Sequence, residues 1–171
     1  MPDHDIAARL AITDQLSRYA RAMDRIDADL GRRVWHADGT ADYGAMYQGS
    51  GPGFVDWVCT THAQMIAHAH RITNVLVEVD GPCASSEAYV HATLRFVRDG
   101  RELVGTVHGR YLDRWSLREG RWAIDHRIYV QDMDELRDAG APLVGSFGGR
   151  RDGDDPSYAV LEPRRGRAPR P

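Results

Sequence analysis

The sequence has few of the residues that build disulfide frameworks or metal-binding motifs. Its two cysteines, Cys59 and Cys83, form neither a CxxC pair nor a disulfide framework. No HExxH motif and no nucleotide-binding glycine loop occur. His62, His68 and His70 are close in sequence, but six residues along a helix or two along a strand would point their rings in different directions. We therefore expect reduced cysteines, no metal and no cofactor.

Long apolar runs and a strong excess of one charge are absent as well. No run of about 18 apolar residues suggests a transmembrane helix. The first residues, MPDHDIAARL, carry acids where a signal peptide has a basic and then an apolar region. The net charge of −3 gives no electrostatic reason to expect nucleic acid or an anionic membrane as a partner. The expectation is a cytoplasmic protein with neither partner.

The first part of the chain has the periodicity of helices. Apolar residues recur at spacings of three and four over residues 5–24, which predicts an amphipathic helix. A turn and a short second helix are expected to run through Trp35, followed by a short strand or strand pair within residues 38–51. Helical spacing returns in residues 52–68, where a proline near the start agrees with a third helix.

After residue 70 the pattern becomes that of strands. Residues 70–81 are rich in β-branched side chains, and three further runs follow at residues 86–98, 101–116 and 121–131. Asp99-Gly100 and the Arg118-Glu119-Gly120 segment are hairpin signals, so these runs should pair antiparallel. Helices followed by a long meander predict an α+β fold with the helices on one face of the sheet.

The end of the chain differs in composition from the rest. Residues 1–131 are expected to form the single folded domain, and residues 132–171 a C-terminal extension dense in Gly, Pro, Arg and Asp. Within the extension, PSYAVL could dock as a short strand or a strap on the body or on a neighbour. The terminal RRGRAPRP is expected to be a disordered, solvated tail.

Tyr19, Asp24 and His70 form a candidate set for proton transfer. A carboxylate beside an imidazole, with a phenol nearby, can remove and donate protons. Asp24 lies at the end of the first helix, where a negative charge opposes the macrodipole and needs a compensating partner. Tyr19 precedes Asp24 by five residues, about 500° around the helix, so both side chains can face one cavity. The alternatives are a solvated Asp24, a strand-start His70 bonded to backbone, and a core Tyr19.

The strands carry further candidates. Arg127 shares strand parity with Asp125 and Tyr129; if that face points inward, it needs a carboxylate partner or a substrate anion, and otherwise forms a surface ion pair. His91 would be a pocket histidine only if its face of the strand lines the interior. His108 is expected outside.

An apolar pocket wall with a few polar groups would suit a ring-shaped substrate. The candidates for this wall are Trp35, Tyr43, Phe54, Val58, Tyr111 and Tyr129.

Three segments resemble the SnoaL-like branch of the nuclear transport factor 2-like superfamily: AITDQLSRYARAMDRID, HRITNVLVEV and GRYLDRWSLREGRWAIDHR. The resemblance covers about residues 5–131. It implies a cystatin-like α+β barrel: a cone-shaped, curved antiparallel or mixed sheet, with three N-terminal helices closing a deep pocket. Scytalone dehydratase, hexachlorocyclohexane dehydrochlorinase and bile-acid 7α-dehydratase have this pattern.

The resemblance also implies roles for individual residues. The family's lyases place an aspartate and a histidine where Asp24 and His70 stand, and the bile-acid dehydratase pattern adds a tyrosine and an arginine at Tyr19 and Arg127. Tyr43 resembles a pocket tyrosine of scytalone dehydratase. The implied activity is a cofactor-independent β-elimination of water or HX from a hydrophobic cyclic molecule, with His70 as the base, in a homotrimer or homodimer.

Other functions remain compatible with the sequence, because the fold alone does not determine function. An isomerase or a polyketide cyclase could use the same pocket. A ligand-binding module would need no dyad, and neither would the small subunit of a ring-hydroxylating dioxygenase.

Overall fold

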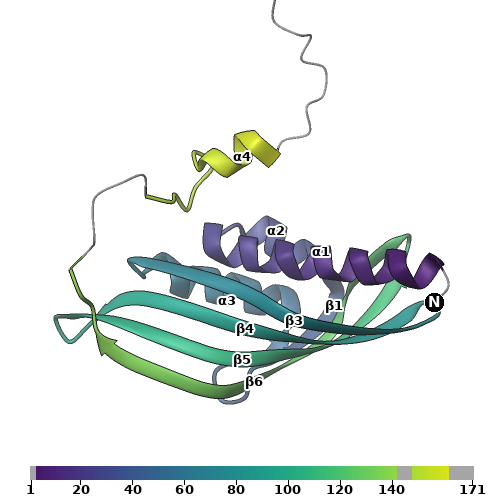
Figure 1. The fold of residues 1–171 in the computed structure, drawn as a ribbon, viewed down its shortest axis with the longest axis horizontal. Coiled ribbons are helices and arrows are strands. Elements are labelled where there is room, and N and C mark those ends of the chain that lie inside the picture. The colour runs from purple at the N-terminus through teal and green to yellow at the C-terminus, as the bar shows by residue number, and fades with distance from the viewer. Residues whose placement is uncertain (1–2, 142–147, 162–171) are drawn as a thin grey trace, which may run out of the picture.

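A computed structural model describes residues 3–141 and 148–161, which form four helices and six strands (Figure 1). In chain order the elements are α1 (Asp3–Arg25), α2 (Ala28–Arg33), β1 (Trp35–Asp42), β2 (Gln48–Ser50), α3 (Gly51–Ala63), β3 (Ala67–Asp80), β4 (Cys83–Arg98), β5 (Arg101–Arg118), β6 (Arg121–Asp138) and α4 (Pro156–Leu161).

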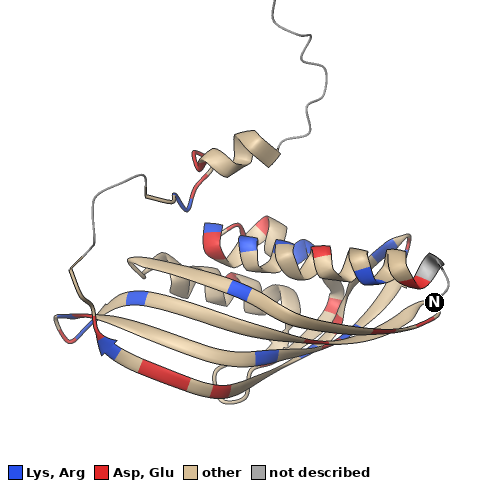
Figure 2. Cartoon of the chain, viewed as in Figure 1, with Lys and Arg blue, Asp and Glu red and all other residues tan. Residues whose placement is uncertain are grey.

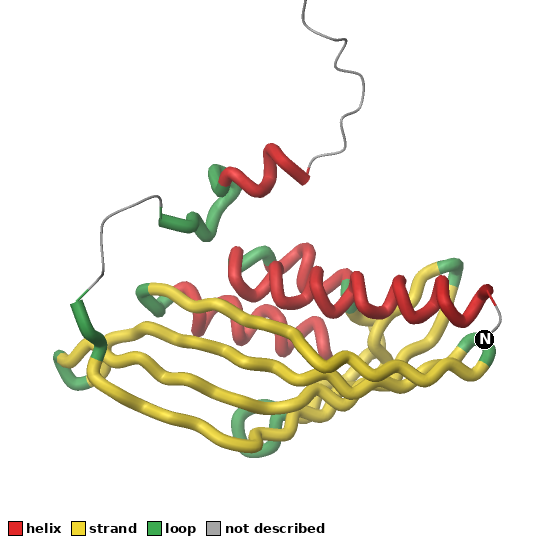
Figure 3. Tube along the Cα trace, viewed as in Figure 1, coloured by secondary structure: helices red, strands yellow, loops and turns green. Residues whose placement is uncertain are grey.

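The six strands form one curved, mixed sheet in the order β2-β1-β6-β5-β4-β3. Strands β3 to β6 are an antiparallel meander, whereas β1 joins the edge of β6 in parallel and β2 pairs antiparallel with β1. Helices α1, α2 and α3 lie over one face of the sheet (Figure 3). The α+β prediction is confirmed, and the sheet is curved but open rather than closed into a barrel.

The two predicted hairpin turns are present. Asp99 and Gly100 have φ angles of 54° and 73°, and Glu119 and Gly120 have angles of 52° and 75°. Two consecutive residues with positive φ are typical of the type I′ turn, whose twist matches that of the strands it joins. These turns set the register of the long meander.

Two helix boundaries differ from the sequence prediction. Trp35 begins β1 instead of continuing the second helix. The third helix ends at Ala63 rather than at residue 68, because the Ile66 amide donates to the Arg95 carbonyl and His68 already pairs with β4. The sheet ladder therefore takes over several residues earlier than the periodicity predicts.

Strand β6 continues to Asp138, past residue 131, where the sequence pattern breaks down. Its last eight residues are exposed, and the acidic residues among them give the end of the strand its red colour in Figure 2. This stretch has no buried face to produce an alternating pattern. It remains a strand because β5 pairs with it up to Asp138.

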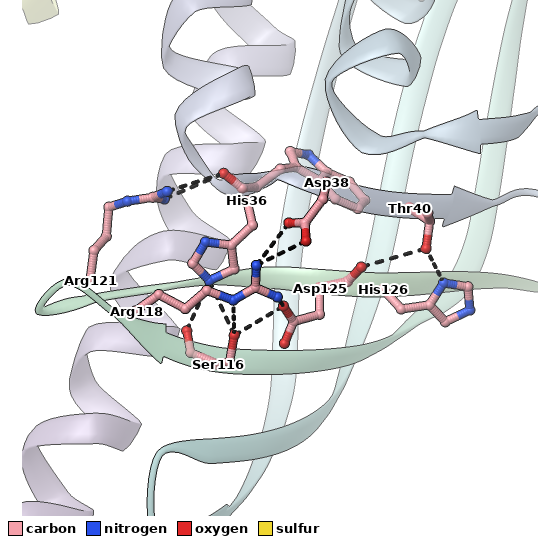
Figure 4. Close-up of polar contacts among 9 residues, drawn as sticks. His36, Asp38, Thr40, Ser116, Arg118, Arg121, Asp125 and His126 are labelled. Carbon is pink, nitrogen blue, oxygen red and sulfur yellow. Dashed lines mark hydrogen bonds and ion pairs between the residues drawn. The ribbon is translucent and has the colours of Figure 1, made fainter.

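A bulge in β6 changes the expected parity of its side chains. Asp125 has no partner in the β5 ladder, so it does not share the face of Arg127. Its carboxylate instead accepts a hydrogen bond from Ser116 Oγ at 2.9 Å and pairs with Arg118 (Figure 4). Arg118 also binds Asp38 at 2.9 Å, which ties β1 to the β5–β6 hairpin.

The C-terminal PSYAVL segment forms the short helix α4 rather than a strand, and it docks on the body. The RRGRAPRP tail lies outside the described residues. Of the helices in the described ranges, none has the length and apolar character to cross a membrane.

The start of α3 gives a test of this packing. A Cβ on Gly51 would overlap the buried Trp35 ring, so Gly51→Ala should lower the free energy of unfolding by about 1–3 kcal/mol. Gly140→Ala is the matched control, because an added Cβ there meets no atom of the described residues within 4 Å. Urea unfolding measures both, and equal stability of the two variants would contradict the packing described here.

Candidate active site

The end of α1 and the start of β3 bring Asp24 and His70 together. Asp24 Oδ1 lies 2.8 Å from the ring nitrogen Nδ1 of His70. The same carboxylate accepts the backbone N–H of His70, at 2.9 Å from Oδ1 and 3.1 Å from Oδ2. Asp24 is thus neither solvated at a free helix end nor paired with a surface cation.

This geometry fixes the tautomer of His70. A carboxylate oxygen accepts hydrogen bonds, so Nδ1 carries the proton that is shared with Asp24 and Nε2 keeps its lone pair. Within the described ranges no group hydrogen-bonds Nε2, and His70 lines a cavity. A buried imidazole oriented in this way can act as a base toward a molecule in the cavity.

The cavity lies between the helices and the concave face of the sheet and has a volume of about 120 Å³. Among the described residues no Asp, Glu, Lys or Arg lines it. Its wall consists of Tyr19, Met23, Tyr43, Met46, Phe54, Val58, His62, His70, Val90, Ala92, Leu94, Val107, Tyr111, Tyr129 and Gln131. Predicted wall residues Tyr43, Phe54, Val58, Tyr111 and Tyr129 are all among them.

The tyrosines of this wall pack against one another. The hydroxyls of Tyr19 and Tyr43 are 3.0 Å apart, and the Tyr43 ring stacks on Phe54 with a centroid distance of 3.8 Å. Burial raises the pKa of Tyr19, Tyr43 and Tyr111 above the ordinary value and that of Tyr129 to about 12. These phenols are therefore protonated at neutral pH and can donate hydrogen bonds.

Arg127 lies behind this tyrosine wall rather than in it. Its side chain is completely buried and pairs with Asp113 through Nε at 2.7 Å and Nη2 at 2.8 Å. The guanidinium stands 4.3 Å from the ring centre of Tyr19 and 4.0 Å from that of Tyr111. Burial opposes its charge and is the largest single influence, but the Asp113 carboxylate together with Tyr43 and Tyr19 outweighs burial and raises the pKa. The sequence predicts that an inward-facing Arg127 binds either a carboxylate of the protein or a substrate anion, and in the structure it binds the carboxylate of Asp113.

Two predicted pocket residues lie elsewhere. His91 is on the outer face of β4, stacked on His108 at a centroid distance of 4.3 Å, because Val90 and Ala92 occupy the inward positions. Trp35 is buried under Gly51 in the core and does not line the cavity. The alternation of small apolar residues along β4 is the signal that identifies its inward face.

The model of the SnoaL-like domain matches residues 4–128. The chain belongs to the SnoaL-like domain family. The match includes Tyr19, Asp24, His70 and Arg127 and ends before the C-terminal extension. Among curated proteins, no sequence match is found.

Solved structures share the fold of this SnoaL-like domain. A candidate aromatic ring hydroxylase from Novosphingobium aromaticivorans is 31% identical, with 78% of this chain and 94% of that chain covered and a TM-score of 0.66. A candidate scytalone dehydratase from the same organism is 17% identical over 86% and 98%, with a TM-score of 0.70. A hexachlorocyclohexane dehydrochlorinase from Novosphingobium barchaimii is 17% identical over 83% and 97%, with a TM-score of 0.71.

The cavity wall of the SnoaL-like domain includes a second histidine, His62, which is not among the predicted site residues. The rings of His62 and His68 are 4.4 Å apart, and those of His62 and His70 are 5.4 Å apart. The expectation that these rings point apart is wrong for two reasons. The helix α3 ends at Ala63 and the chain turns back before His68, and His68 and His70, two residues apart in β3, lie on the same face of that strand. No group of residues suited to hold a metal ion is found in the part of the chain that the structure describes.

His62 gives the domain a testable pH dependence. Burial, then the neighbouring His68 and His70, lower the pKa of His62 to about 3. The unfolded chain binds a proton at His62 below about pH 6.5, whereas the folded chain does not. Stability from this group is therefore complete above that pH and should fall as the pH is lowered toward 3.

Urea unfolding between about pH 7 and pH 5 measures this loss. In His62→Gln the slope of stability against pH should be smaller, with the remaining slope due in part to His68, whose pKa burial also lowers. Equal slopes in the two proteins would contradict a neutral, buried His62.

Proposed function

We propose that this SnoaL-like domain is an acid–base lyase that eliminates water or HX from a small hydrophobic ring compound. The observation that supports it is the Asp24–His70 pair, with the lone pair of His70 Nε2 left for a molecule in the cavity. The named dehydratase and dehydrochlorinase relatives make elimination the reaction to test first.

In the first step His70 Nε2 takes a proton from a carbon next to a carbonyl group. The electron pair of the broken C–H bond moves toward the carbonyl oxygen and forms an enolate. Asp24, which accepts the Nδ1 proton, stabilises the imidazolium that results. In the second step the enolate re-forms the carbonyl, the alkene forms, and the hydroxyl leaves as water with the proton from His70.

Tyr19 is the proposed hydrogen-bond donor to the enolate oxygen. It lines the cavity, and its raised pKa keeps the phenol protonated, so it can donate as negative charge develops. Arg127 acts from behind: its charge faces the rings of Tyr19 and Tyr111 and opposes the rise of their pKa values. Because Asp113 rather than a substrate anion is the partner of Arg127, the proposed role of Arg127 is to position these tyrosines.

The size and wall of the cavity limit the proposed substrate. A buried cavity of about 150 Å³ can hold benzene, and this cavity measures about 120 Å³. The space is thus slightly smaller than one that holds benzene, which favours a single ring as substrate, whereas the four fused rings of a steroid would have to extend beyond it. The aromatic wall and the absence of a charged lining among the described residues favour an uncharged ring.

An isomerase is the second candidate, because the same residues would perform it. If the leaving group is missing, the proton on His70 can return to a different carbon of the same enolate. Hydrogen exchange with solvent occurs in both reactions, and release of water or halide occurs only in elimination.

The proposal can be tested with single-ring β-hydroxy ketones in deuterated water. Wild type should release water and exchange the C–H proton. Asp24→Asn and His70→Ala should reduce both rates by about 10² to 10⁴-fold, because they remove the base or its orientation.

His91→Ala is the matched control for His70→Ala, since His91 lies on the outer face of the same sheet. It should retain wild-type rates. If wild type binds the ring compounds but catalyses neither exchange nor elimination, and the dyad variants bind equally well, a ligand-binding role replaces the lyase.

Tyr19→Phe tests the proposed hydrogen-bond donor. Loss of the hydroxyl should lower kcat by about 10²-fold with a smaller change in KM, because the hydrogen bond is stronger to the enolate than to the ketone. Tyr89→Phe is the control, since Tyr89 is exposed on the outer face. An unchanged kcat in Tyr19→Phe would remove Tyr19 from the mechanism.

A further inference from the structure

Residues 150–158, called here the C-terminal strap, contact the end of the helix that carries Asp24. Asp155 pairs with Arg25 at 3.3 Å, and Arg21 donates to Ser157 Oγ at 2.8 Å. These arginines of α1 stand on either side of Asp24 in the sequence. The strap includes the start of α4, which lies above α1 and α2 in Figure 1.

Arg151 of the strap binds the two other elements of the site. Its Nη1 donates to the His62 carbonyl at 2.9 Å, and its Nη2 donates to the Met65 carbonyl at 2.8 Å. The first carbonyl belongs to the last turn of α3 and the second to the turn that follows, where a cation also compensates the helix dipole. Arg151 Nη1 lies 3.5 Å from Nδ1 of His68, in β3.

The contacts of His68 assign its tautomer. Its Nε2 is 2.8 Å from the Met23 carbonyl, and a carbonyl only accepts, so Nε2 carries the proton. The other nitrogen, Nδ1, keeps its lone pair and faces Arg151. Since Met23 directly precedes Asp24, His68 joins β3 to α1 beside the dyad.

Charged and titratable groups surround His68 on every side. Asp24 comes from α1, His62 from α3, His70 from β3 and Arg151 from the strap. Burial lowers the pKa of His68, and the neighbouring His70 and Arg151 lower it further. The hydrogen bond to the Met23 carbonyl and the charge of Asp24 act in the opposite direction and raise the pKa by less.

We propose that Arg151 is a positioning residue of the active site, which joins the end of α3 to the start of β3 and keeps His68 as the Nε2–H tautomer that binds α1 at the Met23 carbonyl. This inference rests on the proposed function of the Asp24–His70 pair. It adds to the site a residue beyond the part of the chain that matches the family model.

Two substitutions of Arg151 and one control test this role in the full chain. Arg151→Gln should lower kcat by about tenfold with KM changed less than twofold, because orientation is lost while the cavity wall is kept. Arg151→Lys, which retains the charge but cannot reach all three acceptors, should recover part of this loss. Arg150→Gln should leave kcat unchanged, since among the described residues the Arg150 side chain binds only the exposed Asp152 and Asp154.

Histidine titration by NMR supplies a readout that needs no substrate. The His68 signal, assigned by its absence in His68→Gln, should titrate at higher pH in Arg151→Gln than in wild type and in Arg150→Gln. If wild type shows no elimination, the proposed function fails while this titration still tests Arg151. The inference is overturned if Arg151→Gln matches Arg150→Gln in titration, whatever happens to kcat.

Discussion

A buried ion pair in the sheet, between Arg127 and Asp113, determines how the rest of the site is packed. Both side chains have no exposed surface, so their charges depend on each other for compensation. Loss of either partner would leave an isolated buried charge, which costs about 3–5 kcal/mol. The tyrosines of α1 and β5 then pack on the guanidinium, which places their phenols at the cavity wall.

The Asp24 carboxylate serves the fold and the proposed chemistry with the same two oxygens. It accepts the backbone N–H of His70, which anchors β3 at the end of α1, and it accepts the ring N–H, which orients the imidazole. A negative charge at a helix C-terminus is unfavourable by itself. Here the N–H groups of His70 compensate it, so the helix end and the strand start are fixed by one interaction.

The sequence is sufficient for the helices, the meander and the pairing of Asp24 with His70, because these depend on local periodicity, on turn residues and on the family resemblance. The candidate pocket role of His91 is wrong because the apolar alternation of Val90 and Ala92, which marks the inward face of β4, outweighs the polar side chains on the His91 face. The sequence is insufficient for His62: the angles between histidines on a helix do not apply once α3 has ended. The contact of Arg151 with His68 is a long-range contact that no local pattern encodes.

The charges of the site lie one layer behind the cavity. Asp24 reaches the cavity through His70, and Arg127 faces it through Tyr19 and Tyr111. In the described residues the groups that line the cavity are aromatic, apolar, amide or imidazole side chains. An uncharged ring can therefore enter without displacing a solvated ion. In the proposed reaction, charge would develop only as the proton moves to His70. The fixed charges of Asp24 and Arg127 would then already lie at short range, where electrostatic interactions are strong.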